Sequence, residues 1–207
     1  DQFDPAAEPV PVEDRPEIDR WILSNLQALI TTCRDSLSEF NAAQACQATA
    51  SLIDDLSNWY IRRNRRRFWR SRDDDLDLDR SEAGRDKLAA YQTLHTVLVT
   101  LAQLVAPMIP FLAERMYRNL VVANQPDNDQ SVHLTQYPQA DPGLLDPELN
   151  QRMATAQQVV RLGHRLRDES NQRVRQPLPE LRFSTADPDS LASVEQLSEV
   201  IADELNI

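Results

Sequence analysis

A short run of arginine and aromatic residues holds the side chains of this sequence that are best suited to chemistry. Residues 58–72 read NWYIRRNRRRFWRSR and contain seven arginines and no acidic residue. The whole chain has a formal net charge of −11, and without these seven arginines it would hold 15 basic against 33 acidic residues. Planar guanidinium groups suit phosphates, and exposed aromatic rings suit unstacked bases. The run therefore favours contact with a nucleic acid.

The same arginines also have a purely structural interpretation, because five aspartates follow them directly. Charge runs of this kind often do no more than neutralise each other on a solvated face. The five residues are Asp73, Asp74, Asp75, Asp77 and Asp79. They could hold a divalent cation, but they lack the glycine and terminal glutamate of a calcium-binding loop. Trp59 is expected in the core, whereas Phe68 and Trp69 fit either helix packing or base stacking.

Composition limits the kinds of protein that could carry this run. The chain is 41% hydrophobic with only three glycines, which favours helices over a hairpin-rich β fold. Its acidity disfavours indiscriminate binding to nucleic acids or anionic membranes but permits a local basic patch. No apolar run approaches the length of a membrane span, so none is expected. Two cysteines and the lack of a signal-peptide pattern indicate a reduced, cytoplasmic protein.

The elements that position the run are predicted to be helices. Hydrophobic residues recur at helical spacing along five segments and again over residues 189–205, which predicts a mainly α bundle. Each of the five segments starts near a residue suited to a helix cap or a first turn. These starts are Asp14, Asn41, Ser81, Pro110 and Asp146.

The second of these helices is expected to run from Asn41 to about residue 70 and to carry the arginine run at its end. The last apolar residues on its buried face are Trp59 and Tyr60. One turn further along the same face, the residues are arginines. The arginines that continue the face are Arg63, Arg66 and Arg67. The helix dipole favours cations at this end. The bundle is therefore expected to bind a partner at this end of the helix, where arginines replace the apolar residues of the face.

The remaining segments suggest how the chain is divided. Residues 1–14 are rich in proline and acid and are expected to be a linker, and residues 15–173 the helical bundle. Residues 132–137 are expected to be a short extended piece. Residues 174–207 combine a predicted strand at 181–183 with the last helix, which suggests the start of a small, truncated α/β subdomain. The sequence is therefore interpreted as a piece cut from a longer chain.

Residue types that commonly carry catalysis or bind metals are scattered. Three glycines cannot build a phosphate-binding loop, and His95, His133 and His164 lie far apart in the sequence. Cys33 and Cys46 fall on neighbouring expected helices, where they could form a metal site or a redox pair but fit two small core residues better. Neither a catalytic residue nor a metal site is expected.

Five segments together resemble the anticodon-binding domain of isoleucyl-tRNA synthetases, which are class I aminoacyl-tRNA synthetases. The arginine-rich form of the run is similar to the branch shared by eukaryotes and some bacteria. The matches span about residues 19 to 183, and the first and fourth are the most specific. They are NWYIRRNRRRFW at 58–69, DRWILS at 19–24, PMIPFLAERMYRNL at 107–120, SVHLTQYP at 131–138 and VRQPL at 174–178.

The resemblance implies a fold, a task and a set of partners. The fold would be the anticodon-binding helical bundle of class Ia synthetases, and the task would be to hold the anticodon stem-loop of tRNA(Ile). Catalytic and editing domains of the same polypeptide would be its other partners, with no membrane. The family motifs HIGH and KMSKS, which bind and activate ATP, are absent. This piece is therefore expected to be non-catalytic and without a cofactor, while the full-length enzyme would use ATP and Mg.

The candidate RNA-binding residues follow from the arginine run and from the VRQPL segment. They are Arg62, Arg63, Arg65, Arg66, Arg67, Phe68, Trp69, Arg70, Arg175 and Gln176. Arginines would hold phosphates, while aromatic and polar side chains would contact splayed bases. The alternative from another class is a helical protein-interaction module whose arginine-rich end docks an acidic partner.

Overall fold

The computed structural model describes residues 4–5, 7–69, 82–123 and 129–207, and within these residues it contains helices and no strand. The predicted mainly α fold is therefore confirmed. The chain divides into two compact units, Asp1–Leu145 and Asp146–Ile207. The division expected from the sequence, at residues 14 and 173, stays a prediction.

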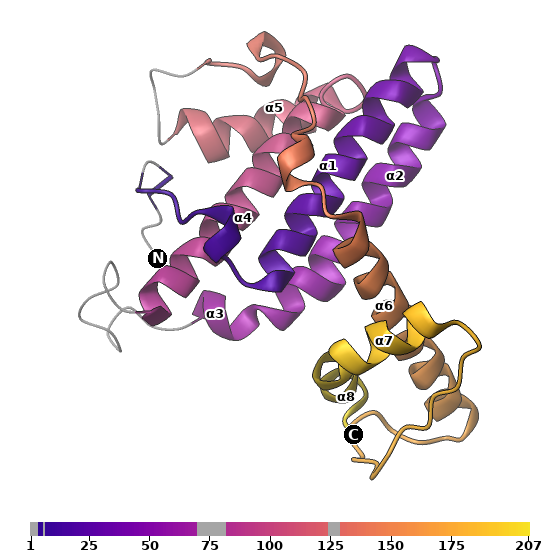
Figure 1. Cartoon of the computed structure of the whole chain (residues 1–207). Coiled ribbons are helices and arrows are strands. Elements are labelled where there is room, and N and C mark those ends of the chain that lie inside the picture. The colour runs from indigo at the N-terminus through magenta and orange to yellow at the C-terminus, as the bar shows by residue number, and fades with distance from the viewer. Residues whose placement is uncertain (1–3, 6, 70–81, 124–128) are drawn as a thin grey trace. The chain divides into compact units, whose positions relative to one another are not determined.

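The described part of the first unit contains five α-helices, and α1, α2 and α4 are the long ones in Figure 1. Two of them continue directly into π-helical segments, Asp55–Ile61 after α2 and Arg118–Val122 after α5. The helices are α1 (Glu17–Ser38), α2 (Ala42–Asp54), α3 (Arg65–Trp69), α4 (Glu82–Val105) and α5 (Pro110–Tyr117). The connections contain three short 3-10 turns, at Val12–Asp14, Val132–Leu134 and Pro142–Leu144.

The core of the first unit is built from one face of each long helix. α1 packs against both α2 and α4, and its large side chains Trp21, Ile22 and Leu26 are buried. A second cluster joins the end of α4 to α5, where Tyr117 and Val121 pack beside Val105. Burial of these apolar faces is the main stabilising term for helices of this length.

Two of the helix caps that the sequence predicts are confirmed and one is wrong. The Asn41 side chain accepts a hydrogen bond from the Gln44 amide at 3.2 Å, and Asp146 caps α6. Asp14 instead ends a 3-10 turn, and α1 begins after Pro16 without a side-chain cap. Pro16 has an extended backbone, with φ −52° and ψ 152°, and its own carbonyl accepts the amide of Asp19. The proline therefore starts the helix in place of the aspartate.

The extended pieces predicted from the sequence are corrected by the structure. Residues 132–134 form a 3-10 turn, and residues 181–183 are irregular. A strand needs a neighbour for its backbone groups, and the described residues offer none. The single helix expected over 189–205 is two helices, α7 (Pro188–Gln196) and α8 (Ser198–Leu205), which meet at Leu197.

The second unit consists of α6 (Pro147–Glu169) packed against α7 and α8. At Gly163 a Cβ atom would lie 2.5 Å from Leu205 Cδ1, so the glycine permits the close approach of α6 and α8. The buried guanidinium of Arg167 then fastens the following loop to the end of α8 through four hydrogen bonds. Its acceptors are the backbone carbonyls of Arg173, Gln176, Leu205 and Asn206.

Helix α4 is long and apolar enough to cross a membrane by length and composition alone. The expectation that the chain has no membrane span stays a prediction. Core helices of globular domains pass the same test, and half of the most apolar window of α4 is buried within the structure. Its buried residues include Val97, Leu101 and Leu104, which lie in the core of the first unit.

Replacing Arg167 by Lys should destabilise the second unit. An ammonium group cannot reach four carbonyls in the plane of a guanidinium, and buried acceptors left unpaired cost on the order of 1–3 kcal/mol. We expect a lower melting temperature and faster hydrogen exchange at the Leu178 amide, which donates to the Asn206 carbonyl at 3.1 Å. Arg165→Lys on the same helix is the control, because its exposed pair with Glu169 contributes little. Equal melting of the two variants would contradict the role given to Arg167.

Candidate nucleic-acid interface

A buried ion pair anchors the helix that carries the arginine run. Asp19 on α1 is fully buried, and Arg67 on α3 donates from Nη1 and Nη2 to its two carboxylate oxygens at 2.7 and 2.8 Å. The Tyr60 hydroxyl donates to Asp19 Oδ1 at 2.8 Å. Arg67 Nε also donates to Asp86 Oδ2 on α4 at 3.0 Å. One guanidinium therefore links α3 to both α1 and α4.

The protonation states of this cluster are fixed by its surroundings. Burial raises the pKa of Tyr60, and the charge of Asp19 raises it further. Burial alone would lower the pKa of Arg67, but its hydrogen bonds to Asp19 and the charges of Asp19 and Asp86 outweigh that effect and raise it. Tyr60 therefore keeps its proton and Arg67 its charge at neutral pH. A buried carboxylate is tolerated here because charged and neutral donors both satisfy it.

Two of the residues predicted to contact RNA are engaged inside the fold: Arg67 belongs to this cluster, and Phe68 packs beside it. The Arg67 side chain is 15% exposed and is occupied by the two carboxylates. The Phe68 ring packs edge-on against Tyr91, with centroids 5.4 Å apart, and against Tyr60 at 6.3 Å. Both side chains therefore hold α3 in place. For Phe68 the structure favours helix packing over base stacking.

The π-helical segment ahead of α3 decides which residues turn inward. It spans Asp55–Ile61 and shifts the register of the helix just before the arginines. Asn64 is consequently buried, whereas Arg63, which continues the apolar face in a regular helix, is half-buried. Asn64 Oδ1 accepts from Arg67 Nη1 at 3.0 Å, while its Nδ2 has no partner among the described residues. Asn64 was not predicted from the sequence, although it is the residue that interrupts the arginines between Arg62 and Arg67.

The outward side of α3 presents an aromatic ring with a guanidinium on it. Trp69 is 74% exposed, and the Arg65 guanidinium carbon lies 4.9 Å from its ring centroid. Arg62 and Arg66 are exposed one turn apart. An exposed indole with cations beside it suits base stacking and phosphate contact. Arg70, the next residue of the predicted site, lies outside the described residues.

The last two predicted site residues belong to the second unit. Arg175 and Gln176 are exposed on the loop that follows α6, and the Gln176 carbonyl accepts a hydrogen bond from Arg167 at 3.0 Å. Arg167 thus fastens the backbone of this loop, while Arg175 and Gln176 remain exposed. These two residues belong to the second unit, whereas the arginine run belongs to the first.

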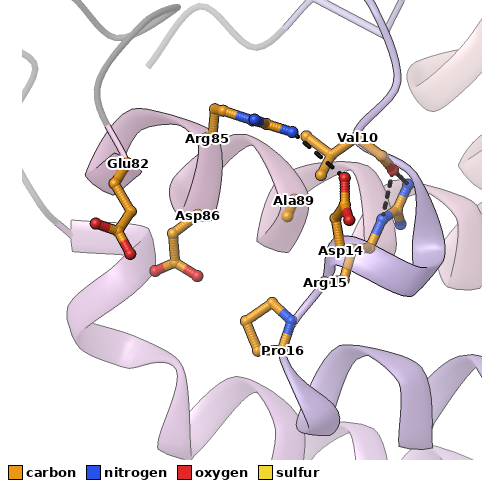
Figure 2. Close-up of a pocket in the computed structure, with 8 residues that line it drawn as sticks. All are labelled: Val10, Asp14, Arg15, Pro16, Glu82, Arg85, Asp86 and Ala89. Carbon is orange, nitrogen blue, oxygen red and sulfur yellow. Dashed lines mark hydrogen bonds and ion pairs between the residues drawn. The ribbon is translucent and has the colours of Figure 1, made fainter.

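A pocket of about 680 Å³ lies beside the buried cluster, between the N-terminal segment and the first turns of α4 (Figure 2). Arg85 reaches toward Asp14 at 3.6 Å, and Arg15 donates from Nε and Nη2 to the Val10 carbonyl at 3.0 and 2.8 Å. Three carboxylates and two guanidiniums line the pocket, so its charge does not favour phosphate. Its lining residues are Val10, Asp14, Arg15, Pro16, Glu82, Arg85, Asp86 and Ala89.

The two cysteines differ in their surroundings. Cys33 is a buried core residue as expected, and its Sγ lies 3.8 Å from Thr49 Oγ1. Cys46 is exposed, with Sγ 3.3 Å from Met108 Sδ, so its assignment to the core was wrong. Among the residues that the structure covers, no three His, Cys, Asp or Glu side chains group as metal ligands would. The aspartates after the arginine run lie outside those residues.

Comparison with known proteins identifies close relatives of this chain. Residues 19–182 match the family of the anticodon-binding domain of tRNA ligases. The isoleucine–tRNA ligase of Thermobifida fusca is 44% identical over 196 residues, which cover 94% of this chain and 17% of the relative. That of Dehalococcoides mccartyi is 41% identical over 192 residues, 93% of this chain and 18% of the relative. That of Bacteroides thetaiotaomicron is 40% identical over 208 residues, 100% of this chain and 17% of the relative.

These matches cover nearly the whole of this chain but a small part of each relative. The chain spans 17–18% of the length of these three ligases. The resemblance stated from the sequence motifs is confirmed, because a family match and three relatives near 40% identity agree with it.

Arg67→Ala and Arg66→Ala should separate the inward and outward arginines by stability. Removing Arg67 leaves the Asp19 carboxylate buried without its cation, which costs on the order of 3–5 kcal/mol. Removing the exposed Arg66 should change the free energy of unfolding by less than about 0.5 kcal/mol. Urea unfolding of the purified chain measures both. A small loss for Arg67→Ala would refute the anchoring role of the buried pair.

Tyr60→Phe should reveal the buried hydroxyl through pH. At pH 7 the variant loses a donor to Asp19 and should be less stable by about 1–3 kcal/mol. Because the pKa of Tyr60 is raised on folding, the unfolded chain alone releases this proton above pH about 10. The parent should then lose stability with rising pH, by up to about 1.4 kcal/mol per pH unit. Urea unfolding from pH 7 to 11 should show the difference shrinking; a constant difference would contradict the burial of Tyr60.

Proposed function

Since the chain belongs to the family of the anticodon-binding domain of tRNA ligases, we propose that it binds the anticodon stem-loop of isoleucine tRNA as part of an isoleucine–tRNA ligase. The relatives that cover the chain carry that enzyme name. In such an enzyme, catalytic and editing domains of the same cytoplasmic polypeptide would charge and check the acceptor end with ATP and Mg. This chain would supply binding and no catalysis.

The exposed Trp69 with Arg65 stacked on it is the observation that carries the proposal. The indole of Trp69 is 74% exposed, and a base can stack on the face of the ring that Arg65 leaves open. Arg62 and Arg66 are exposed one turn apart and suit the phosphates on either side of that base. Salt-dependent attraction by such a patch acts even though the whole chain is acidic.

The roles within the arginine run differ from one residue to the next. Arg67 and Phe68 would act by holding α3 against α1 and α4, so their contribution to RNA binding is positional. Direct contact would fall to the outward residues of the run, and in the second unit to Arg175 and Gln176. The outward set comprises the exposed Arg62, Arg65, Arg66 and Trp69. The half-buried Arg63 and, as an expectation from sequence alone, Arg70 would join them.

Changing Arg62 and Arg66 together to Ala should weaken binding of isoleucine tRNA and lower the slope of log affinity against log salt by up to about two units. Each phosphate contact contributes about one unit to that slope. Fluorescence anisotropy with the tRNA transcript at several salt concentrations measures both quantities. The control is Arg152→Ala with Arg182→Ala, which removes the same charge from ion-paired positions in the second unit.

Trp69→Leu should reduce affinity by about 5- to 100-fold with the salt slope kept, since base stacking contributes on the order of 1–3 kcal/mol. The melting temperature should hold, because the ring is 74% exposed. If the double arginine variant matches its control and Trp69→Leu binds as the parent does, this surface does not contact tRNA. If the parent shows no salt-dependent tRNA binding at all, a protein-docking role for the arginine-rich end takes its place.

A further inference from the structure

The outer face of α5 exposes an apolar surface that none of the described elements of the first unit covers. The Phe111 side chain is 91% exposed and Leu112 is 54% exposed. Single exposed apolar residues are common, but two adjacent ones on a helix are a candidate contact surface. The arginine run plays no part in this surface, which lies on a different helix.

Two arginines, one on α5 and one at the start of the π-helical segment that follows it, lie on the same side as the exposed ring. Phe111, Arg115 and Arg118 are spaced i, i+4 and i+7, so they form one stripe along the helix. All three are exposed, whereas Ala113 and Tyr117 on the opposite side are buried against α4. The stripe therefore combines one aromatic ring with two guanidiniums along about two turns.

The only acidic residue of α5 does not neutralise this stripe. Glu114 Oε2 accepts hydrogen bonds from the Ser131 hydroxyl at 2.8 Å and from the Val132 amide at 3.0 Å. Within the part of the chain that the structure describes, Arg115 and Arg118 make no ion pair. The carboxylate is thus engaged with the segment after α5, and the outer face keeps its positive charge.

A second exposed phenylalanine provides a contrast within the same unit. Phe40, in the turn between α1 and α2, is 97% exposed and has a left-handed backbone with φ 59°. The charged residue next to it is the exposed Glu39, and further back along α1 lie the exposed Asp35 and Arg34. Exposure alone therefore does not distinguish the two rings, but the sign of the adjacent charge does. The carboxylate beside Phe40 repels a polyanion, whereas the two arginines near Phe111 attract one.

We propose that the outer face of α5 is a second RNA-contact surface, on which Phe111 stacks on an unpaired base while Arg115 and Arg118 bind the adjoining phosphates. The proposal rests on the tRNA-binding function proposed above and adds a distinct site to it. Aromatic rings beside guanidiniums are the usual means of holding single-stranded nucleotides.

The second surface is distant from the first. α3 is fastened near Asp86 at the start of α4, whereas α5 packs beside Val105 at its end. At about 1.5 Å per residue, this separation along α4 is on the order of 30 Å. Two contacts so far apart would fix the orientation of a bound stem-loop as well as its position, because each alone permits rotation about itself.

The test compares Phe111→Leu, Phe111→Trp and Phe40→Leu in the whole chain. The probes are an isoleucine tRNA anticodon stem-loop and a hairpin with the same stem but a compact loop without splayed bases. We expect Phe111→Leu to weaken stem-loop binding by about 5- to 100-fold, with little effect on the hairpin, and Phe111→Trp to bind as tightly as the parent or more tightly. Phe40→Leu, the same chemical change at an equally exposed ring, should leave binding unchanged. Arg115→Ala with Arg118→Ala should lower the salt slope by up to about two units.

The outcomes separate this proposal from the function on which it rests. If the parent binds the stem-loop and the Arg62/Arg66 variant weakens it, but Phe111→Leu does not, the α5 surface is overturned and the function stands. If Phe111→Leu and Phe40→Leu weaken binding equally, the assignment to α5 is overturned as well. If Phe111→Leu abolishes self-association of the chain in sedimentation while RNA binding is kept, the face is a protein interface and the proposal is wrong.

Discussion

The buried carboxylate of Asp19 is the constraint on which the rest of the first unit depends. A charge with no exposed surface requires compensation, and here Arg67 and Tyr60 supply three hydrogen bonds to its two oxygens. The partners come from α3 and from the π-helical segment before it. Since α3 has only five residues, it is too short to be stable alone. The ion pair therefore holds the short helix in place, and with it the arginines that face solvent.

One stretch of sequence thereby serves two purposes. The extra residue of the π-helical segment rotates the chain so that Asn64, Arg67 and Phe68 turn toward α4 while Arg65, Arg66 and Trp69 remain outside. Residues of the same type then have different physical roles. A guanidinium between two carboxylates contributes to stability, whereas one stacked on an exposed indole remains accessible to a ligand.

An acidic chain can keep basic surfaces when the nearby carboxylates are occupied within the fold. Asp19 and Asp86 are bound to Arg67, and Glu114 is bound to Ser131 and Val132. The net charge of −11 thus limits long-range attraction to RNA without preventing local contact. Such an arrangement favours selective over indiscriminate binding. The acidic surface repels a polyanion, so only one that fits the basic patches gains enough attraction to bind.

The sequence by itself determined the mainly α fold, the caps at Asn41 and Asp146 and the family, because periodicity, caps and motifs are encoded within a few turns of chain. It gave a false cap at Asp14 and a false strand at 181–183, where a proline and the lack of a pairing strand decide the conformation. Only the tertiary structure showed which arginine turns inward. Asp19 and Arg67 are 48 residues apart, and no local pattern records a pairing between positions that become neighbours only when the helices pack.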